Sequence, residues 1–84
     1  MKLVAYSKQA AKTLRRMPTN EARRVRTKVA QFAADPRSQA NNVKALVGLP
    51  YLRLRVGDWR VIMDDRRETV LEVLKVGARG EIYR

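Results

Sequence analysis

Three arginines lie close together in a stretch of sequence that is typical of a β-hairpin. Residues 51–56 alternate strictly between apolar and polar side chains, and residues 59–63 follow after a two-residue turn signal, Gly57-Asp58. A turn of that length sets Arg55 opposite Arg60 and leaves Arg53 on the same face. All but one of the apolar side chains fall on the other face: Leu52, Leu54, Val56, Trp59, Val61 and Met63. The alternation therefore predicts a hairpin with an apolar face and an arginine-rich face.

The arginine-rich face breaks a local rule of sheet stability. Like charges directly opposite each other destabilise a strand pair by roughly 0.2–1 kcal/mol. An anion would offset this repulsion, because guanidinium groups bind phosphate oxygens through two parallel hydrogen bonds. The same pattern also fits a solvated basic face on which the arginines splay apart. We expect a phosphate-binding surface here, with the solvated face as the alternative.

Composition points to a polyanionic partner and excludes several kinds of enzyme. The 84 residues contain 19 Lys and Arg against 8 Asp and Glu, which gives a net charge of +11. No His and no Cys are present, so no disulfide, thiol nucleophile, Ser-His-Asp triad or zinc enzyme is expected. We expect no metal or cofactor. The partner is RNA, DNA, an acidic protein or an anionic membrane surface.

The elements that position the hairpin follow from periodicity and breaker residues. Ser7 is a candidate N-cap, and Asp35-Pro36 ends the second helix. We expect a strand over 2–6, helices over 8–17 and 21–34, a polar loop over 35–42, strands over 51–56, 59–63 and 69–76, a bend over 77–80 and a last strand over 81–83; residues 43–49 are ambiguous. No linker or repeat divides residues 1–84, so one domain is expected. The chain shows no segment for a membrane, and the lack of cysteine fits a cytoplasmic protein.

Three ordered pieces of the sequence resemble the RelE/ParE toxin superfamily. These are residues 43–50 (VKALVGLP), residues 53–62 (RLRVGDWRVI), and the closing Val-Gly-x-Arg with a tyrosine just after it, within residues 74–84. The resemblance covers essentially the whole chain. It implies an α+β fold of order β-α-α-β-β-β(β). In this fold an N-terminal strand and an antiparallel helical hairpin pack on a three- to four-stranded antiparallel sheet.

Members of this superfamily are the toxins of type II toxin–antitoxin pairs, which implies an acidic cognate antitoxin as partner. RelE-like members enter the ribosome and cut mRNA, whereas ParE-like members inhibit DNA gyrase. Our first expectation is a ribosome-dependent mRNA endonuclease in which the 2′-OH attacks the adjacent phosphate. The alternatives are a gyrase inhibitor that acts by binding, and a non-catalytic RNA-binding or degenerate toxin.

The resemblance also implies roles for three residues of the RelE-like site. Arg60 matches the arginine that contacts the scissile phosphate, and Arg79 matches the arginine that stabilises the phosphate charge. Tyr83 matches the C-terminal tyrosine of the active site. These three are the expected catalytic residues. The expected RNA- and phosphate-binding residues are Arg53, Arg55, Lys44 and Tyr51.

The sequence departs from the RelE pattern at the position of the general base. RelE itself has a pair of lysines on the strand before the turn, and these positions are Tyr51 and Arg53 here. Other members use a His and a Glu, and this chain has no His. Arginine is a poor proton acceptor. Tyr83 is the first candidate base, and Glu81 and Lys44 are weaker ones.

Overall fold

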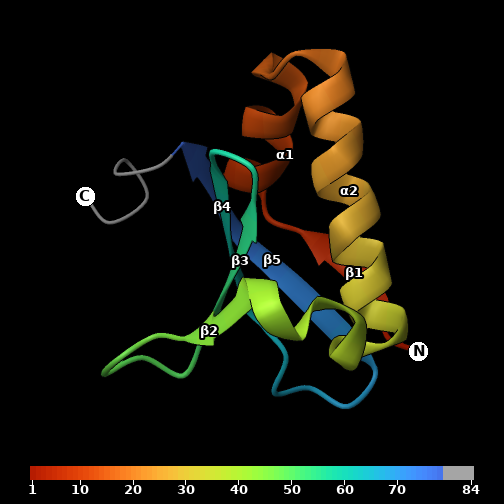
Figure 1. Cartoon of the computed structure of the whole chain (residues 1–84), viewed down its shortest axis with the longest axis vertical. Coiled ribbons are helices and arrows are strands. Elements are labelled where there is room, and N and C mark those ends of the chain that lie inside the picture. The colour runs from red at the N-terminus through yellow and green to blue at the C-terminus, as the bar shows by residue number, and fades with distance from the viewer. Residues whose placement is uncertain (79–84) are drawn as a thin grey trace.

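Over residues 1–78, which the computed structural model describes, the chain folds into a helical hairpin and a five-stranded sheet (Figure 1). The elements in chain order are β1 (Leu3–Tyr6), α1 (Lys8–Arg16), α2 (Thr19–Ala34), the 3-10 helix η1 (Pro36–Asn42), β2 (Val43–Ala45), β3 (Leu52–Val56), β4 (Trp59–Asp64) and β5 (Val70–Ala78). The expected α+β class is confirmed. The bend expected at 77–80 is not seen where β5 continues through Ala78, and the strand expected at 81–83 lies outside the described residues.

Two details of the expected sheet are different in the structure. The strands of residues 1–78 lie in the order β1-β5-β4-β3-β2, so the sheet has five strands rather than three or four. β1 pairs with β5 in parallel, which makes the sheet mixed rather than antiparallel. β2 adds the opposite edge, antiparallel to β3. Periodicity does not detect these edges, because β2 has only three residues and the direction of β1 depends on a distant partner.

A side-chain cap sets the start of α1, and the residues that precede prolines set the ends of both helices. Ser7 Oγ accepts a hydrogen bond from Ala10 N at 3.0 Å and donates one to Leu74 O at 2.7 Å, so the cap of α1 also fixes the helix on β5. Met17 is extended because the proline after it disfavours helical backbone. α2 starts at Thr19, two residues before the expected start at 21. No helix within residues 1–78 is both long and apolar enough to cross a membrane.

The segment expected to be a polar loop is a 3-10 helix instead. The Asp35 side chain accepts a hydrogen bond from Arg37 N at 3.1 Å and caps η1. Pro36 occupies the first turn, where its missing N–H costs nothing. The polar composition of this segment predicts a loop, but side-chain hydrogen bonds such as the Asp35 cap order it as a short helix. η1 carries Asn42 to the start of β2, beside the arginine-rich hairpin.

The core lies between the helical hairpin and one face of the sheet. Both expected helix stripes are buried, including Leu14 on α1 and Val25 on α2. The sheet contributes buried side chains from its three central strands: Leu54, Val56, Val61, Met63, Leu71, Val73 and Val76. Trp59 is partly buried and packs against this cluster, as its place on the apolar face predicts.

The β3–β4 hairpin has the register that the sequence predicts. Arg55 lies opposite Arg60, Leu54 opposite Val61, and Val56 opposite Trp59. Gly57 has φ +58°, and none of the described non-glycine residues has positive φ, which fits a type II′ turn with glycine first. The burial of the apolar face under α1 and α2 thus fixes the arginines on the other face.

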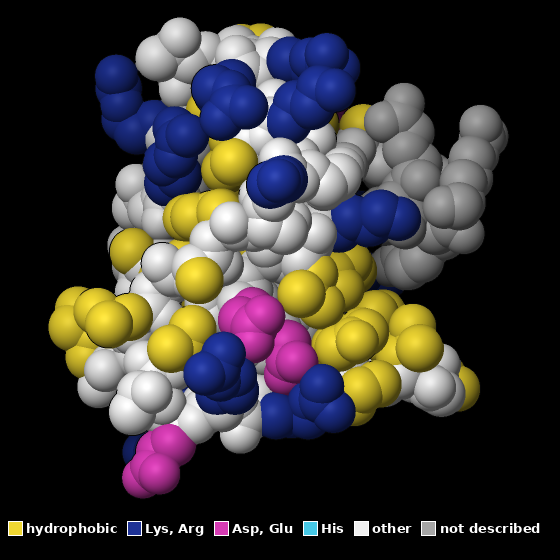
Figure 2. All heavy atoms as spheres, turned by 180° about the vertical axis from the view of Figure 1, so that it is seen from behind, with side chains coloured by type: hydrophobic (Ala, Val, Ile, Leu, Met, Phe, Trp, Pro, Cys, Tyr) yellow, Lys and Arg dark blue, Asp and Glu magenta, His cyan; other side chains and the backbone are white. Residues whose placement is uncertain are grey.

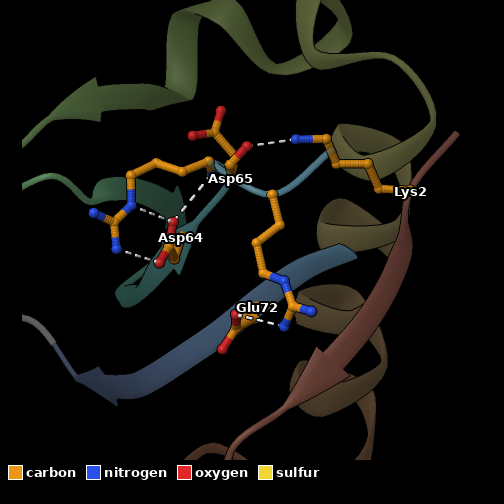
Figure 3. A network of polar contacts seen from close by, with 6 residues as sticks. Lys2, Asp64, Asp65 and Glu72 are labelled. Atoms are coloured by element: carbon orange, nitrogen blue, oxygen red, sulfur yellow. Dashed lines mark hydrogen bonds and ion pairs between the residues drawn. The ribbon is translucent and has the colours of Figure 1, made fainter. Parts of the chain in front are cut away.

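Polar contacts tie the β4–β5 loop to the rest of the sheet (Figure 3). Asp64, which is buried, accepts hydrogen bonds from Arg66 N at 3.0 Å, Nε at 3.0 Å and Nη2 at 2.8 Å. Lys2 Nζ donates to the Asp65 carbonyl oxygen, which joins the N-terminus to the loop. Arg67 pairs with Glu72 at 3.4 Å. The Arg66 hydrogen bonds and charge lower the pKa of the Asp64 carboxyl to about 2.

The two faces of β3 predict opposite effects for adjacent substitutions. Leu54 is fully buried, so Leu54→Asp places an unpaired charge in the core and costs more than about 4 kcal/mol, which leaves the domain largely unfolded. Arg55→Ala removes a like-charge contact, so the melting temperature stays level or rises by a few degrees. Thermal melts followed by circular dichroism test both. Equal destabilisation by the two substitutions would contradict the face assignment.

The Asp64 network predicts a loss of stability in acid. The folded-state pKa of about 2 lies below the unfolded value of about 3.9, so Asp64 stabilises the fold above about pH 4. That contribution disappears as the pH falls through about 4 toward 2. Asp64→Asn should melt at a lower temperature at pH 7, and its melting temperature should change less between pH 4 and 2.

Asp65→Asn is the matched control for the acid experiment, because the structure gives the Asp65 side chain no ion pair within residues 1–78. This variant should follow the wild-type stability curve across the acid range. Parallel curves for wild type and Asp64→Asn from pH 7 to 2 would rule out the role of the network.

Candidate nucleic-acid interface

The β3–β4 turn anchors one arginine of the arginine-rich face. Arg60 Nη1 donates hydrogen bonds to the carbonyl oxygens of Gly57 and Trp59, both at 3.1 Å. Arg60 is half-buried, whereas Arg55 opposite it is exposed. The turn backbone therefore restrains the Arg60 guanidinium. A restrained donor loses less conformational entropy when it binds an anion than a free one does.

A hollow opens between α2 and this turn, and we call it the turn hollow. Its volume is about 450 Å³. Its polar and charged lining side chains are Arg24 and Lys28 from α2, Asn42 from η1, Arg55, Asp58 and Arg60. Four cations thus face one carboxylate in a space large enough for a nucleotide-sized group.

A second hollow, which we call the strand hollow, extends along β2 and β3. It has a volume of about 320 Å³ and is lined by Asn41, Asn42, Lys44, Arg53, Arg55 and Arg60. Asn42, Arg55 and Arg60 line both hollows, so the two adjoin across the Arg55–Arg60 pair. Four of the expected site residues, Arg53, Arg55, Arg60 and Lys44, therefore gather at one place.

Two carboxylates of the described chain are paired away from these hollows, and Asp58 is the described carboxylate that lines the turn hollow. Within residues 1–78, the ion pairs are Arg66–Asp64 and Arg67–Glu72, at the end of β4 and on β5. On the back of the molecule, Figure 2 shows Lys and Arg gathered at the upper end, whereas the Asp and Glu side chains in view lie in the lower half beside other Lys and Arg side chains. In the described chain, Arg55, Lys44, Arg24 and Lys28 have no ion pair. Such a surface attracts a polyanion.

Tyr51 does not join the other expected binding residues. It lines neither hollow, and the Arg66 guanidinium carbon lies 5.6 Å from the centroid of its ring. Tyr51 precedes β3 at the open end of the hairpin, about 13 Å along an extended strand from Arg55. Its ring thus belongs with the Asp64–Arg66 contact. Arg79 and Tyr83, the other expected catalytic residues, lie outside the described residues.

Sequence reasoning missed the contribution of α2 and η1 to this surface. Arg24 and Lys28 look like solvated helix residues, and Asn42 like part of a polar loop. Their four-residue spacing does put Arg24 and Lys28 on one side of a helix. Only the packing of α2 against β3 shows which side that is. Within residues 1–78, no cluster of three or more His, Cys, Asp or Glu residues is arranged to hold a metal ion.

Comparison with known structures finds the same fold over nearly the whole chain. The archaeal RelE–RelB complex from Pyrococcus horikoshii OT3 contains a chain with TM-score 0.78 and 28% identity, covering 95% of this chain and 97% of that one. The intact E. coli RelBE toxin–antitoxin complex gives TM-score 0.72 at 22% identity, with coverages of 96% and 99%. The Methanococcus jannaschii RelB–RelE complex gives TM-score 0.69 at 23% identity, with 93% of each chain covered. No curated protein sequence matches the chain closely enough to count as a relative.

A family model supplies the assignment that fold similarity alone does not. The model of the ParE toxin of the type II toxin–antitoxin system parDE matches residues 4–83. The match includes both strands of the arginine-rich hairpin and the closing segment with Arg79 and Tyr83. The chain therefore belongs to the ParE toxin family of the RelE/ParE superfamily, the toxins of type II toxin–antitoxin systems.

Proposed function

We propose that this toxin is a ribosome-dependent mRNA endonuclease. The observation that carries the proposal is the crowding of Arg55 and Arg60, with Arg53 and Lys44 beside them, around two adjoining hollows. Guanidinium groups bind phosphate oxygens through two parallel hydrogen bonds, so such a cluster suits a phosphate backbone. A second support is the likeness to the Pyrococcus horikoshii structure, which is that of a RelE–RelB complex and shares 28% identity with this chain.

The reaction is an in-line attack of a ribose 2′-OH on the adjacent phosphate. It breaks the bond to the 5′ oxygen of the next nucleotide, and yields a 2′,3′-cyclic phosphate and a 5′-OH. Charge develops on the phosphate oxygens, so cationic donors held in place before the reaction lower its barrier. Arg60, restrained by the Gly57 and Trp59 carbonyls, takes this role. Arg55 and Arg53 assist it.

Arg79 and Tyr83 complete the proposed site. Both lie outside the described residues, so their roles rest on the resemblance to the RelE pattern. Arg79 adds charge stabilisation at the phosphate. Tyr83 takes or delivers the proton. If the ribosome presents the mRNA, the protein does not need to bind the strand tightly by itself.

Gyrase inhibition is the second candidate function, and the family match favours it, because the matching model is that of the ParE toxin. The absence of both His and the RelE lysine pair also fits a toxin that acts by binding. The third candidate is a toxin that binds RNA without cutting it. For all three, we propose an acidic cognate antitoxin as partner, since the solved relatives are complexes with RelB and this chain carries +11.

Arg60→Ala separates the endonuclease from the gyrase inhibitor. We expect cleavage of mRNA on programmed ribosomes to slow by on the order of 10²–10³-fold, since a restrained donor to the developing charge is lost. The fold should persist, because Arg60 packs on the outer face. Single-turnover cleavage on programmed ribosomes measures this rate. Mapping of mRNA 5′ ends after induction, with plasmid supercoiling assayed in the same cells, tells the two functions apart.

Arg16→Ala is the matched control for this experiment, as Arg16 is exposed on α1 and lines neither hollow. It should cut mRNA at the wild-type rate. Loss of supercoiling without new mRNA ends in wild-type cells would replace the endonuclease by the gyrase inhibitor. Neither effect, with RNA binding retained, would leave the non-catalytic toxin.

Tyr83→Phe tests whether the tyrosine hydroxyl takes part in proton transfer. Phenylalanine keeps the ring and deletes only the hydroxyl. If the hydroxyl transfers the proton, single-turnover cleavage slows by about 10²–10⁴-fold while ribosome binding and melting temperature stay near wild type. A Phe variant that cleaves at the wild-type rate, with Ala destabilising the protein, would assign the ring a packing role only.

A further inference from the structure

An arginine of α2, Arg24, approaches Arg60 at the β3–β4 turn. A Cβ built on Gly57 would lie 4.0 Å from Arg24 Nη1, so the Arg24 side chain reaches from α2 to the turn. Arg60 Nη1 bonds to the carbonyl oxygen of the same glycine at 3.1 Å. Guanidinium groups from α2 and β4 are therefore brought together at one residue of the turn.

Lys28 adds a third cation to the lining of the turn hollow. It follows Arg24 by four residues on α2, is half-buried, and lines the turn hollow but not the strand hollow. Like charges at this spacing on a helix repel each other. Neither side chain has a hydrogen bond or ion pair within residues 1–78. Asp58 is the one described carboxylate in the lining of the turn hollow, against four cations, so most of this positive charge is not offset.

Asn42 marks the boundary between the two hollows. It is half-buried and lines both of them. Its amide has no hydrogen-bond partner within residues 1–78 and carries both a donor and an acceptor. An amide at this point can bond a nucleobase edge or a ribose hydroxyl, while the cations on either side bind phosphates.

We propose that Arg24 and Lys28 form a second phosphate subsite, the α2 subsite, which holds the phosphate next to the one bound by Arg55 and Arg60. The ligand is single-stranded RNA that crosses the Arg55–Arg60 pair from the strand hollow to the turn hollow. Asn42 contacts the nucleotide between the two phosphates. The inference rests on the proposed endonuclease function and extends it to how the strand is held.

The chemistry of the turn hollow favours RNA over an acidic peptide of an antitoxin. An amphipathic peptide needs apolar anchor pockets. Among the described residues, the one apolar side chain in the lining of the turn hollow is Val56, which is only 5% exposed. The regularly spaced phosphates of an RNA strand, in contrast, can occupy two adjoining cationic hollows that share lining residues.

The test measures the affinity of purified full-length toxin for a short single-stranded RNA, while the toxin and the RNA are changed singly and together. Single methylphosphonate linkages, which carry no charge, are placed in turn along the RNA. For the wild type, we expect neutralisation of two neighbouring linkages to weaken binding, each about tenfold. Arg24→Ala should also weaken binding about tenfold and lower the magnitude of the salt slope of log K by about 0.7.

The decisive result is the coupling between protein and RNA changes. Arg24→Ala should lose sensitivity to one linkage only, and Arg60→Ala to its neighbour. Arg23→Ala is the matched control, as it is exposed on α2 and lines neither hollow, and it should bind like the wild type. Arg24→Lys should recover part of the affinity, since it keeps the charge.

Three outcomes would overturn the α2 subsite: no RNA binding by the wild type, the same loss for Arg23→Ala as for Arg24→Ala, or equal sensitivity of Arg24→Ala to every linkage. An effect of Arg24→Ala on antitoxin affinity alone would assign the turn hollow to the antitoxin instead. If the coupling is found but the wild type does not cut mRNA on ribosomes, the subsite stands and the endonuclease function fails. The two failures are thus told apart.

Discussion

The burial of one face of the β3–β4 hairpin constrains everything on its other face. Leu54 and Val61 are fully buried against the helical hairpin, and side chains alternate along a strand. A slip of one residue would expose that apolar set and bury the arginines instead. The energy of the core therefore holds Arg55 against Arg60, although the two charges repel each other. The fold tolerates this repulsion because the core contributes far more stability than one like-charge pair removes.

The tight turn makes this constraint useful for binding. Gly57, with φ +58°, closes the hairpin in two residues, and its carbonyl oxygen holds Arg60. Arg24 approaches the same glycine from α2. A larger side chain at position 57 would be strained by the positive φ, and it would contact Arg24. One turn thus couples the backbone geometry of the hairpin to the positions of cations from two elements.

Charge is distributed so that the surface around this turn stays positive. Asp64 and Glu72 are occupied by Arg66 and Arg67 beyond the open end of the hairpin (Figure 3). Asp64 also receives a backbone hydrogen bond, which fixes the start of the β4–β5 loop. These two acids therefore stabilise the scaffold away from the hollows, and among the described residues Asp58 alone adds a carboxylate to the turn hollow, against four cations. A strongly positive surface of this kind attracts polyanions.

The sequence by itself determined the local features: both helix stripes, the Ser7 cap, and the hairpin register that pairs Arg55 with Arg60. These depend on periodicity and turn chemistry, which act between residues close in sequence. Only the tertiary structure decided that β1 pairs in parallel with β5, that Arg24 reaches Gly57, and that Tyr51 turns to Arg66. Each of these depends on how distant elements pack, and a helix or strand pattern carries no record of its partner. Four predicted site residues lie around the hollows because the hairpin register is a local feature. The α2 and η1 residues that complete the lining were not foreseen, because their position depends on packing between distant elements.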